Sequence, residues 1–79
     1  MSTTVKLADL PTGHTAVIAS LPSGVPSLTR LREMGVLPGT KILLVRRAPL
    51  GDPLEISVRG SLLSLRRQET ELIEVHPEA

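Results

Sequence analysis

The chain has no cysteine, phenylalanine, tyrosine or tryptophan among its 79 residues. Without cysteine it can form neither disulfides nor thiolate metal sites, and this composition fits a reducing compartment. Without aromatic rings it lacks the platforms on which many proteins stack the bases of single-stranded nucleic acid. The hydrophobic content is nevertheless 41%, so we expect a globular domain whose core consists of aliphatic side chains and methionine.

An excess of charge and long apolar runs are also missing. Nine Lys and Arg residues stand against eight Asp and Glu, and a formal net charge of +1 gives no strong field for nucleic acid. No run approaches the roughly 18 apolar residues of a membrane span, and the first ten residues lack the apolar core of a signal peptide. We therefore expect one cytoplasmic domain over residues 1–79, ordered from about 5 to 75, without direct membrane insertion.

Short β-branched or alternating segments, separated by turn residues, predict strands over residues 14–21, 41–48, 54–60, 62–66 and 71–75. In the third of these, alternation places Leu54, Ile56 and Val58 on the buried face. In the fourth, Leu63 and Leu65 are expected to point inward. Residues 49–53 have the composition of a tight turn, and residues 60–61 predict a two-residue corner between strands.

A helix of about nine residues is predicted after the first strand. Pro26 suits its first turn, Gly35 suits a C-terminal cap with positive φ, and Pro38 prevents the helix from resuming. Single helical turns are expected over residues 7–13 and 66–70, with loose ends at 1–4 and 76–79. Five short strands leave edges that closure removes, so we predict a mainly β fold, a small five-stranded SH3-like barrel with one or two short helices inserted near its N-terminal side.

Four sequence elements stand in a fixed order from residue 31 to the end of the last predicted strand. They comprise Leu31, Met34, Gly35, Pro38 and Gly39; then Ala48–Pro53, "APLGDP"; then Leu63, Leu65 and Arg66; then Ile73 and Val75. In this order and spacing the chain resembles the FeoA family, the small cytoplasmic component of bacterial ferrous iron transport systems. The resemblance extends from about Leu7 to Val75. It implies an SH3-like barrel with helices near its start, and a binding role rather than catalysis.

The resemblance further implies that the partner is FeoB, a membrane GTPase transporter, bound and modulated from the cytoplasmic side. The leading hypothesis is therefore a non-enzymatic accessory protein of ferrous iron uptake that acts as a GTPase regulator. Two alternatives stay open: a transition-metal-binding sensor or chaperone domain, and a nucleic-acid-binding SH3-like barrel. Because acidic residues are interleaved with the arginines, we expect no nucleic acid as partner.

Catalytic and cofactor sites have little support in the residues. The serines read as caps, turns and outward strand positions, Asp52 has a role in its turn, and no phosphate-binding loop motif with its lysine occurs. A metal site needs three or more converging ligands, whereas the chain has only two histidines, His14 and His76. We assign no catalytic residue and no required cofactor. His14, His76 and Glu74 are kept as candidates for an adventitious surface zinc or ferrous iron ion.

Protein binding is the remaining activity for the surface, and packing of the inserted helix over Leu43 and Val45 is the open alternative. Residues 42–45 are apolar on both faces of their predicted strand, more than one buried side requires, and other leucines fall in loops or at outward positions. The partner-binding candidates are Val36, Leu37, Leu43, Val45, Arg47, Leu50, Arg59 and Leu62. A second group is assigned a structural role in the turns: Gly35, Pro38, Gly39, Gly51, Asp52 and Pro53. Weak self-association stays open, since small barrels with apolar edges associate easily.

Overall fold

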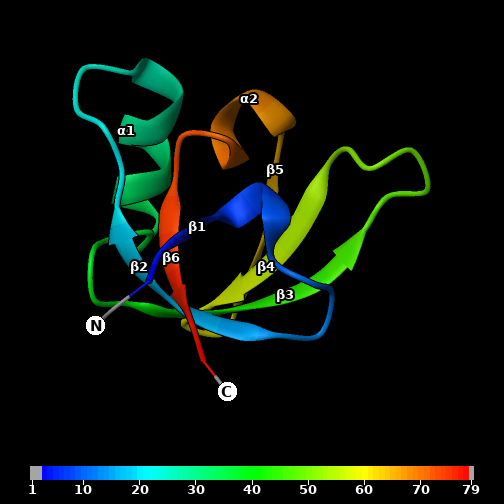
Figure 1. Cartoon of the computed structure of the whole chain (residues 1–79). Helices are drawn as coiled ribbons and strands as arrows, with labels where there is room; N and C mark the ends of the chain where they lie inside the picture. Colours follow the sequence, from blue (N-terminus) through cyan, green and yellow to red (C-terminus); the bar gives the residue numbers. More distant parts are fainter. Residues whose placement is uncertain (1–2, 79) are drawn as a thin grey trace.

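One antiparallel sheet carries the fold, because each alternating segment has a single apolar face to bury. The computed structural model describes residues 3–78 (Figure 1). The elements in chain order are β1 (Val5–Lys6), a 3-10 turn η1 (Leu7–Asp9), β2 (Thr15–Ser20), α1 (Pro26–Glu33), β3 (Lys41–Arg47), β4 (Leu54–Val58), β5 (Ser61–Leu65), α2 (Arg67–Thr70) and β6 (Glu74–Pro77). None of the helices in this part of the chain is long and apolar enough to cross a membrane.

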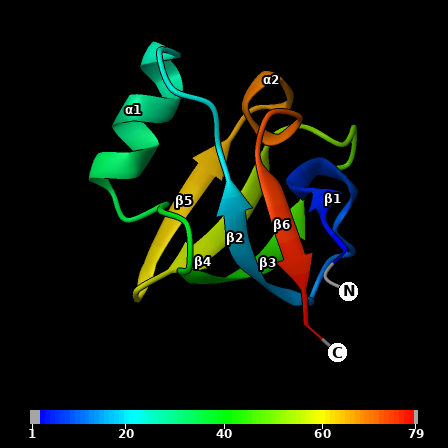
Figure 2. The same ribbon diagram turned by 60° about the vertical axis from the view of Figure 1, so that its left-hand side comes forward.

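The strands follow the order β1-β6-β2-β3-β4-β5, and every neighbouring pair is antiparallel. The sheet curls around a common interior, with α1 and α2 at the same end (Figures 1 and 2). The last strand, β6, lies between β1 and β2, so the two ends of the chain are joined within one sheet. The prediction of a mainly β fold with a helix after the first long strand is confirmed.

The hydrophobic core is built from aliphatic side chains, and Glu69 and Thr70 of α2 are buried beside it. Leu54, Ile56 and Val58 are buried on β4, and Leu63 and Leu65 are buried on β5, as their alternation predicts. The same cluster also contains residues of η1, β2, α1, β3 and β6 and of the connections between elements: Leu7, Leu10, Ala16, Ile18, Leu21, Leu28, Leu31, Val36, Ile42, Leu44, Ile73 and Val75. Each fully buried Leu, Ile or Val contributes about 1.5–3 kcal/mol of transfer free energy, so this cluster is the main source of stability.

The ends of the chain differ from the prediction. A sixth strand, β1, pairs Val5 with Val75, within a segment that has too few residues to show alternation. The last strand begins at Glu74 rather than at Glu71, because the turn that follows α2 continues to Leu72, whose N–H donates to the Glu69 carbonyl at 3.1 Å. Residues 76 and 77, expected to be loose, therefore belong to β6.

The β4–β5 turn is also displaced by one residue from the prediction. Val58 pairs with Ser61, so the two-residue loop is Arg59-Gly60 rather than Gly60-Ser61. Both loop residues have positive φ, 51° for Arg59 and 81° for Gly60, which is the conformation of a type I′ hairpin turn. An arginine is unusual in this region of φ, which explains why the pattern favoured Ser61.

The helix α1 docks through one apolar side and an arginine that borders it. Leu28 and Leu31 enter the core. Arg32, four residues after Leu28, is half-buried, and its guanidinium donates to the carbonyls of Leu21 (2.8 Å) and Pro22 (2.9 Å). These bonds satisfy backbone acceptors in the segment between β2 and α1, where no strand neighbour is present.

The corner after α1 is a Schellman motif. The Gly35 N–H donates to the Arg32 carbonyl and the Val36 N–H to the Leu31 carbonyl, both at 3.0 Å. Gly35 has φ of 107°, as its position predicts, and the apolar contact typical of this motif is available because Leu31 and Val36 are both buried. The motif ends the helix and turns the chain back toward the sheet.

The second glycine of the corner attaches it to β2. The Gly39 N–H donates to the Ile18 carbonyl at 2.8 Å, and the Ile18 N–H donates to the Thr40 carbonyl at 2.9 Å. Gly39 also has positive φ, 89°. The segment from Gly35 to Thr40 is therefore a structural connection between α1 and β3.

We predict that Gly35→Val destabilises the fold by about 1–2 kcal/mol or more. An added Cβ meets only ordinary contacts, the nearest being Arg59 Cδ at 3.5 Å, so the cost comes from the positive φ that a β-branched residue avoids. Chemical denaturation measures the change in free energy of unfolding. Ser64→Val on the exposed face of β5 is the matched control and should change it by less than about 0.5 kcal/mol. Equal stabilities for the two variants would contradict the proposed role of Gly35.

Candidate partner-binding surface

The predicted partner-binding residues divide into exposed and buried members. Val36 is 0% exposed and packs in the core as part of the Schellman motif, so it is removed from the set. Leu37 and Val45 are 39% and 38% exposed, and Leu62 is 59% exposed. Leu43 is half-buried. The sequence does not distinguish Val36 from Leu37, because both lie between the same two glycines and only the hydrogen bonds of the turn decide which side chain points inward.

The sheet brings Leu43 and Leu62 into one row on its outer face. Leu43 on β3 is opposite Ser57 on β4, and Ser57 is opposite Leu62 on β5. A change of register between Leu44 and Arg46 marks a β-bulge that contains Val45. Leu43 and Leu62, 19 positions apart in the sequence, therefore form a short apolar row with Ser57 between them.

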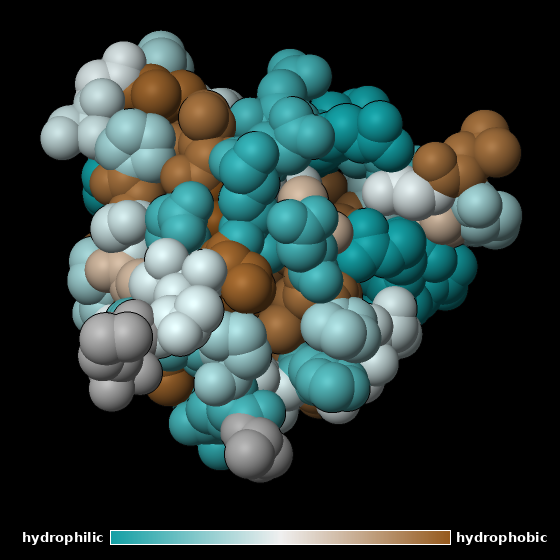
Figure 3. All heavy atoms as spheres, viewed as in Figure 1, coloured by the Kyte–Doolittle hydropathy of each residue, from teal (hydrophilic) through white to brown (hydrophobic). Residues whose placement is uncertain are grey.

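Leu50 is separate from this row, at the tip of the β3–β4 loop, and 91% of its surface is exposed. Figure 3 shows hydrophobic side chains at the protruding end of this loop. The loop is held by three hydrogen bonds: Gly51 N–H to the Ala48 carbonyl (2.7 Å), Ala48 N–H to the Pro53 carbonyl (3.1 Å) and Arg67 N–H to Asp52 Oδ1 (2.8 Å). The turn residues therefore present a leucine from a fixed loop anchored to α2.

Arg47 has a structural role within the chain. Its guanidinium donates to the carbonyls of Ala8 (3.1 Å) and Leu10 (3.0 Å) and so ties η1 to the end of β3. It also lines a hollow of about 190 Å³ together with Asp9, Arg67 and Glu71. This volume is below the roughly 300 Å³ of an ordinary small-molecule pocket, and the lining charges are of both signs.

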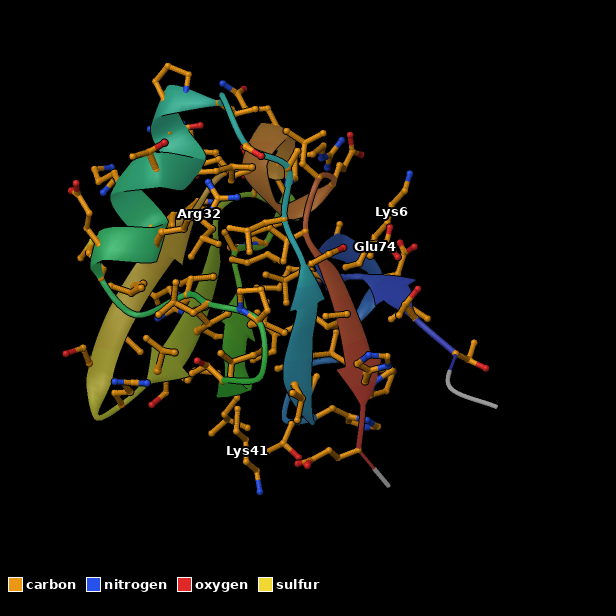
Figure 4. All side chains as sticks on the ribbon, turned by 90° about the vertical axis from the view of Figure 1, so that its left-hand side faces the viewer. Lys6, Arg32, Lys41 and Glu74 are labelled. Atoms are coloured by element: carbon orange, nitrogen blue, oxygen red, sulfur yellow. The ribbon has the colours of Figure 1, made fainter. Side chains whose placement is uncertain are left out.

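The metal-binding candidates lie on the paired strands β2 and β6. His76 is opposite Val17, and His14 stands just before β2, with its carbonyl accepting from the Leu44 N–H. Glu74 accepts a hydrogen bond from Thr4 Oγ1 at 2.9 Å, and Figure 4 shows it beside Lys6 on the outside of the β1–β6 pair. Glu74 and His76 share one face of β6, because they are two residues apart on a strand. Between residues 3 and 78, no group of three or more His, Cys, Asp or Glu side chains is placed to hold a metal ion.

Arginines lie before and after β5, and Arg59 is the one among them that was predicted to bind a partner. Arg59 precedes the strand in the turn, and Arg66 and Arg67 follow it. Arg30 of α1 approaches the same end, with its Nη2 3.8 Å from Glu69 Oε2. The sequence did not predict that Met34 (44%) and Leu72 (43%) are exposed. Both lie just beyond the end of a helix, where helical spacing no longer gives the direction of a side chain.

The FeoA domain family model matches residues 5–77. The chain belongs to the FeoA family. A curated relative of this FeoA-family chain is the "Fe(2+) transport protein A/Fe(2+) transporter FeoB fusion protein" of Porphyromonas gingivalis, 37% identical over 71 residues. The aligned part is 90% of this chain but only 8% of that protein.

Solved structures of FeoA proteins have the same fold. The FeoA protein of Chlorobium tepidum is 40% identical, with a TM-score of 0.88 over 95% of this chain and 71% of that one. Stenotrophomonas maltophilia FeoA complexed with zinc, described as a prokaryotic SH3 domain protein, is 29% identical, with a TM-score of 0.78 over 90% and 88%. The SH3-like fold and the family predicted from the sequence are thus confirmed.

The division between core and surface gives a paired prediction. Val36→Ala removes two buried methyl groups and should lower the free energy of unfolding by about 1–2 kcal/mol. Leu50→Ser removes a side chain that is almost wholly in solvent and should change it by less than about 0.5 kcal/mol. Urea denaturation of both variants tests this, and a larger loss for Leu50→Ser would contradict the burial of Val36 and the exposure of Leu50.

Proposed function

We propose that this FeoA-family protein is a non-enzymatic cytoplasmic accessory of ferrous iron uptake that binds an FeoB-type membrane GTPase transporter and modulates it. The observation that carries the proposal is the fusion of the two proteins in one relative. In a fused chain the linker keeps the domains at high local concentration without any affinity of their own. Where the two proteins are separate chains, the same association must come from surface contacts.

The surface of the described residues supports such contacts. Leu37, Val45, Leu50 and Leu62 expose apolar area on a small domain whose core is already filled. Arg59 is exposed in the β4–β5 turn, three positions before Leu62. Exposed apolar residues bordered by arginine are typical of the central part of protein interfaces.

Calorimetric titration of the protein into full-length FeoB in detergent tests the proposal, in the nucleotide-free, GDP-bound and GTP-analogue-bound states. We expect saturable binding in at least one state and a changed rate of GTP hydrolysis on saturation. Leu50→Ser and Leu62→Ser should each weaken binding by about fivefold or more if they contact the transporter. Lys6→Gln, at an exposed position of β1 at the opposite end of the strand order from β5, is the control. Absence of binding in every nucleotide state would reject direct contact.

The second candidate function is binding of zinc or ferrous iron at the surface, which is favoured by the zinc complex of the Stenotrophomonas maltophilia relative. In this chain Glu74 and His76 share a face of β6, which supplies two ligands of the four that zinc prefers. We propose that such an ion is adventitious, completed by water or by a second molecule.

Titration with zinc and, without oxygen, with ferrous iron tests this candidate. We expect weak binding that His76→Ala removes and His14→Ala leaves unchanged. His76 has Glu74 on its own strand face, whereas Glu78, which lines a hollow with His14, is paired with Lys41 at 3.2 Å. Binding of one ion per chain, retained at nanomolar concentration and lost in both histidine variants, would instead favour a metal sensor or chaperone.

A further inference from the structure

Strand β5 leaves one edge of the sheet open. It is the last strand in the order and pairs only with β4. Because Val58 and Ser61 close a two-residue hairpin, Ser61, Leu63 and Leu65 exchange main-chain hydrogen bonds with β4. The N–H and C=O groups of Leu62 and Ser64 therefore point away from β4. In the part of the chain that the structure describes, no main-chain hydrogen bond reaches these groups.

This edge lacks the usual protection against pairing with another chain. Natural sheets protect edges with charged residues, proline or a β-bulge. The sequence of β5, Ser-Leu-Leu-Ser-Leu, contains no charge or proline, and its register with β4 is regular throughout. The edge is therefore able to accept a further strand over its central residues.

The side chains on the outer face of β5 define what such a strand needs. Leu62 is 59% exposed and continues the row formed by Leu43 and Ser57. An apolar side chain placed opposite Leu62 on an added strand would extend this row and bury part of the exposed leucine. Directly opposed apolar side chains on neighbouring strands stabilise the pairing.

The charges at the two ends of β5 distinguish between possible occupants. Arg59 lies at the start of the strand and Arg66 and Arg67 at its end, and none of the three forms an ion pair with a carboxylate within residues 3–78. A second copy of β5 in antiparallel pairing would bring the arginines of one end close to those of the other. Like charges facing across strands are destabilising, so the charges favour an acidic segment over self-pairing.

We propose that β5 binds an extended, acidic segment of a partner protein by strand addition. The segment pairs its main chain with Leu62 and Ser64, places an apolar side chain against Leu62, and carries Asp or Glu toward Arg59 and Arg66. Main-chain bonds supply affinity in this mode of recognition, and the flanking side chains supply specificity. Binding of such a segment at β5 does not depend on whether a transporter or another protein supplies it.

The probe is a nine-residue blocked peptide with alternating valine and threonine in its centre and two acidic residues at each end. In an NMR titration of the full chain, we expect saturable shifts centred on the amides of Leu62 and Ser64, with slowed hydrogen exchange at both. The same peptide with lysine in place of the acidic residues should bind at least about threefold more weakly. Affinity for the acidic peptide should fall as salt rises from 50 to 300 mM.

Ser64→Pro is the decisive variant. It removes an N–H that faces the open edge while leaving the bonds to β4 intact, and proline is tolerated on edge strands. It should reduce peptide affinity at least about tenfold, whereas Ser64→Ala, which keeps the N–H, should not. Amide spectra of both variants establish that the fold is retained.

The charge requirement is tested by Arg59→Asn combined with Arg66→Gln. Asparagine accepts the positive φ at position 59, so the turn is preserved. We expect at least about a threefold loss of affinity and a weaker salt dependence, while the control Lys6→Gln, on β1 at the other end of the strand order, leaves both unchanged. Shifts centred away from β5, equal binding of the acidic and lysine peptides, or full binding by Ser64→Pro would overturn the proposal. Protection of Leu62 and Ser64 in a dimer without peptide would overturn it too.

Because the probe is a peptide alone, this experiment is independent of the transporter titration. Transporter binding without peptide binding would leave the proposed function standing and reject the β5 site. Peptide binding without transporter binding would support the β5 site and reject direct contact with the transporter.

Discussion

The fold depends on the burial of an aliphatic core in a chain that has no aromatic side chains. Leucine, isoleucine and valine are smaller than aromatic residues, so many of them must meet in one place to exclude the same area from water. A flat sheet of such short strands would leave its apolar face exposed to water. Curling the sheet, and adding Leu28 and Leu31 from α1, brings nearly every inward side chain into a single cluster.

This requirement explains the sharp connections. The chain changes direction between α1 and β3 within a few residues, and the Schellman motif at Gly35 accomplishes this while placing Val36 in the core. The β3–β4 loop is held to α2 through Asp52, and η1 is held to β3 through Arg47. Polar side chains such as Asp52 and Arg47 thus hold the backbone around the core, and they do not form a pocket of ordinary size.

What remains for function is the outside of the barrel. A domain this small cannot hide every apolar residue, and those left exposed are distributed among the outer sheet face, the β3–β4 loop and the ends of the helices. Surface of this kind suits association with another protein better than binding of a small molecule. The fused relative provides a partner for that surface, and the open edge of β5 provides a physical mode by which a partner segment can attach.

The sequence by itself determined the elements whose signals are local. Alternation predicted the buried faces of β4 and β5, and the positions of Pro26 and Gly35 predicted where α1 begins and ends. These signals depend on residues a few positions apart, so a single sequence contains enough information to place them. The number of short strands then predicted the SH3-like barrel, which the family resemblance also implied.

Only the tertiary structure decided the features that depend on distant partners. The two residues of β1 form a strand because β6 is beside them, and Arg47 is an internal tie because carbonyls nearly 40 positions away accept its hydrogen bonds. The row of Leu43 and Leu62 and the open main-chain groups of β5 follow from strand order and register. Periodicity indicates which face of a strand is apolar. Whether a neighbouring element covers that face depends on the packing of the whole chain.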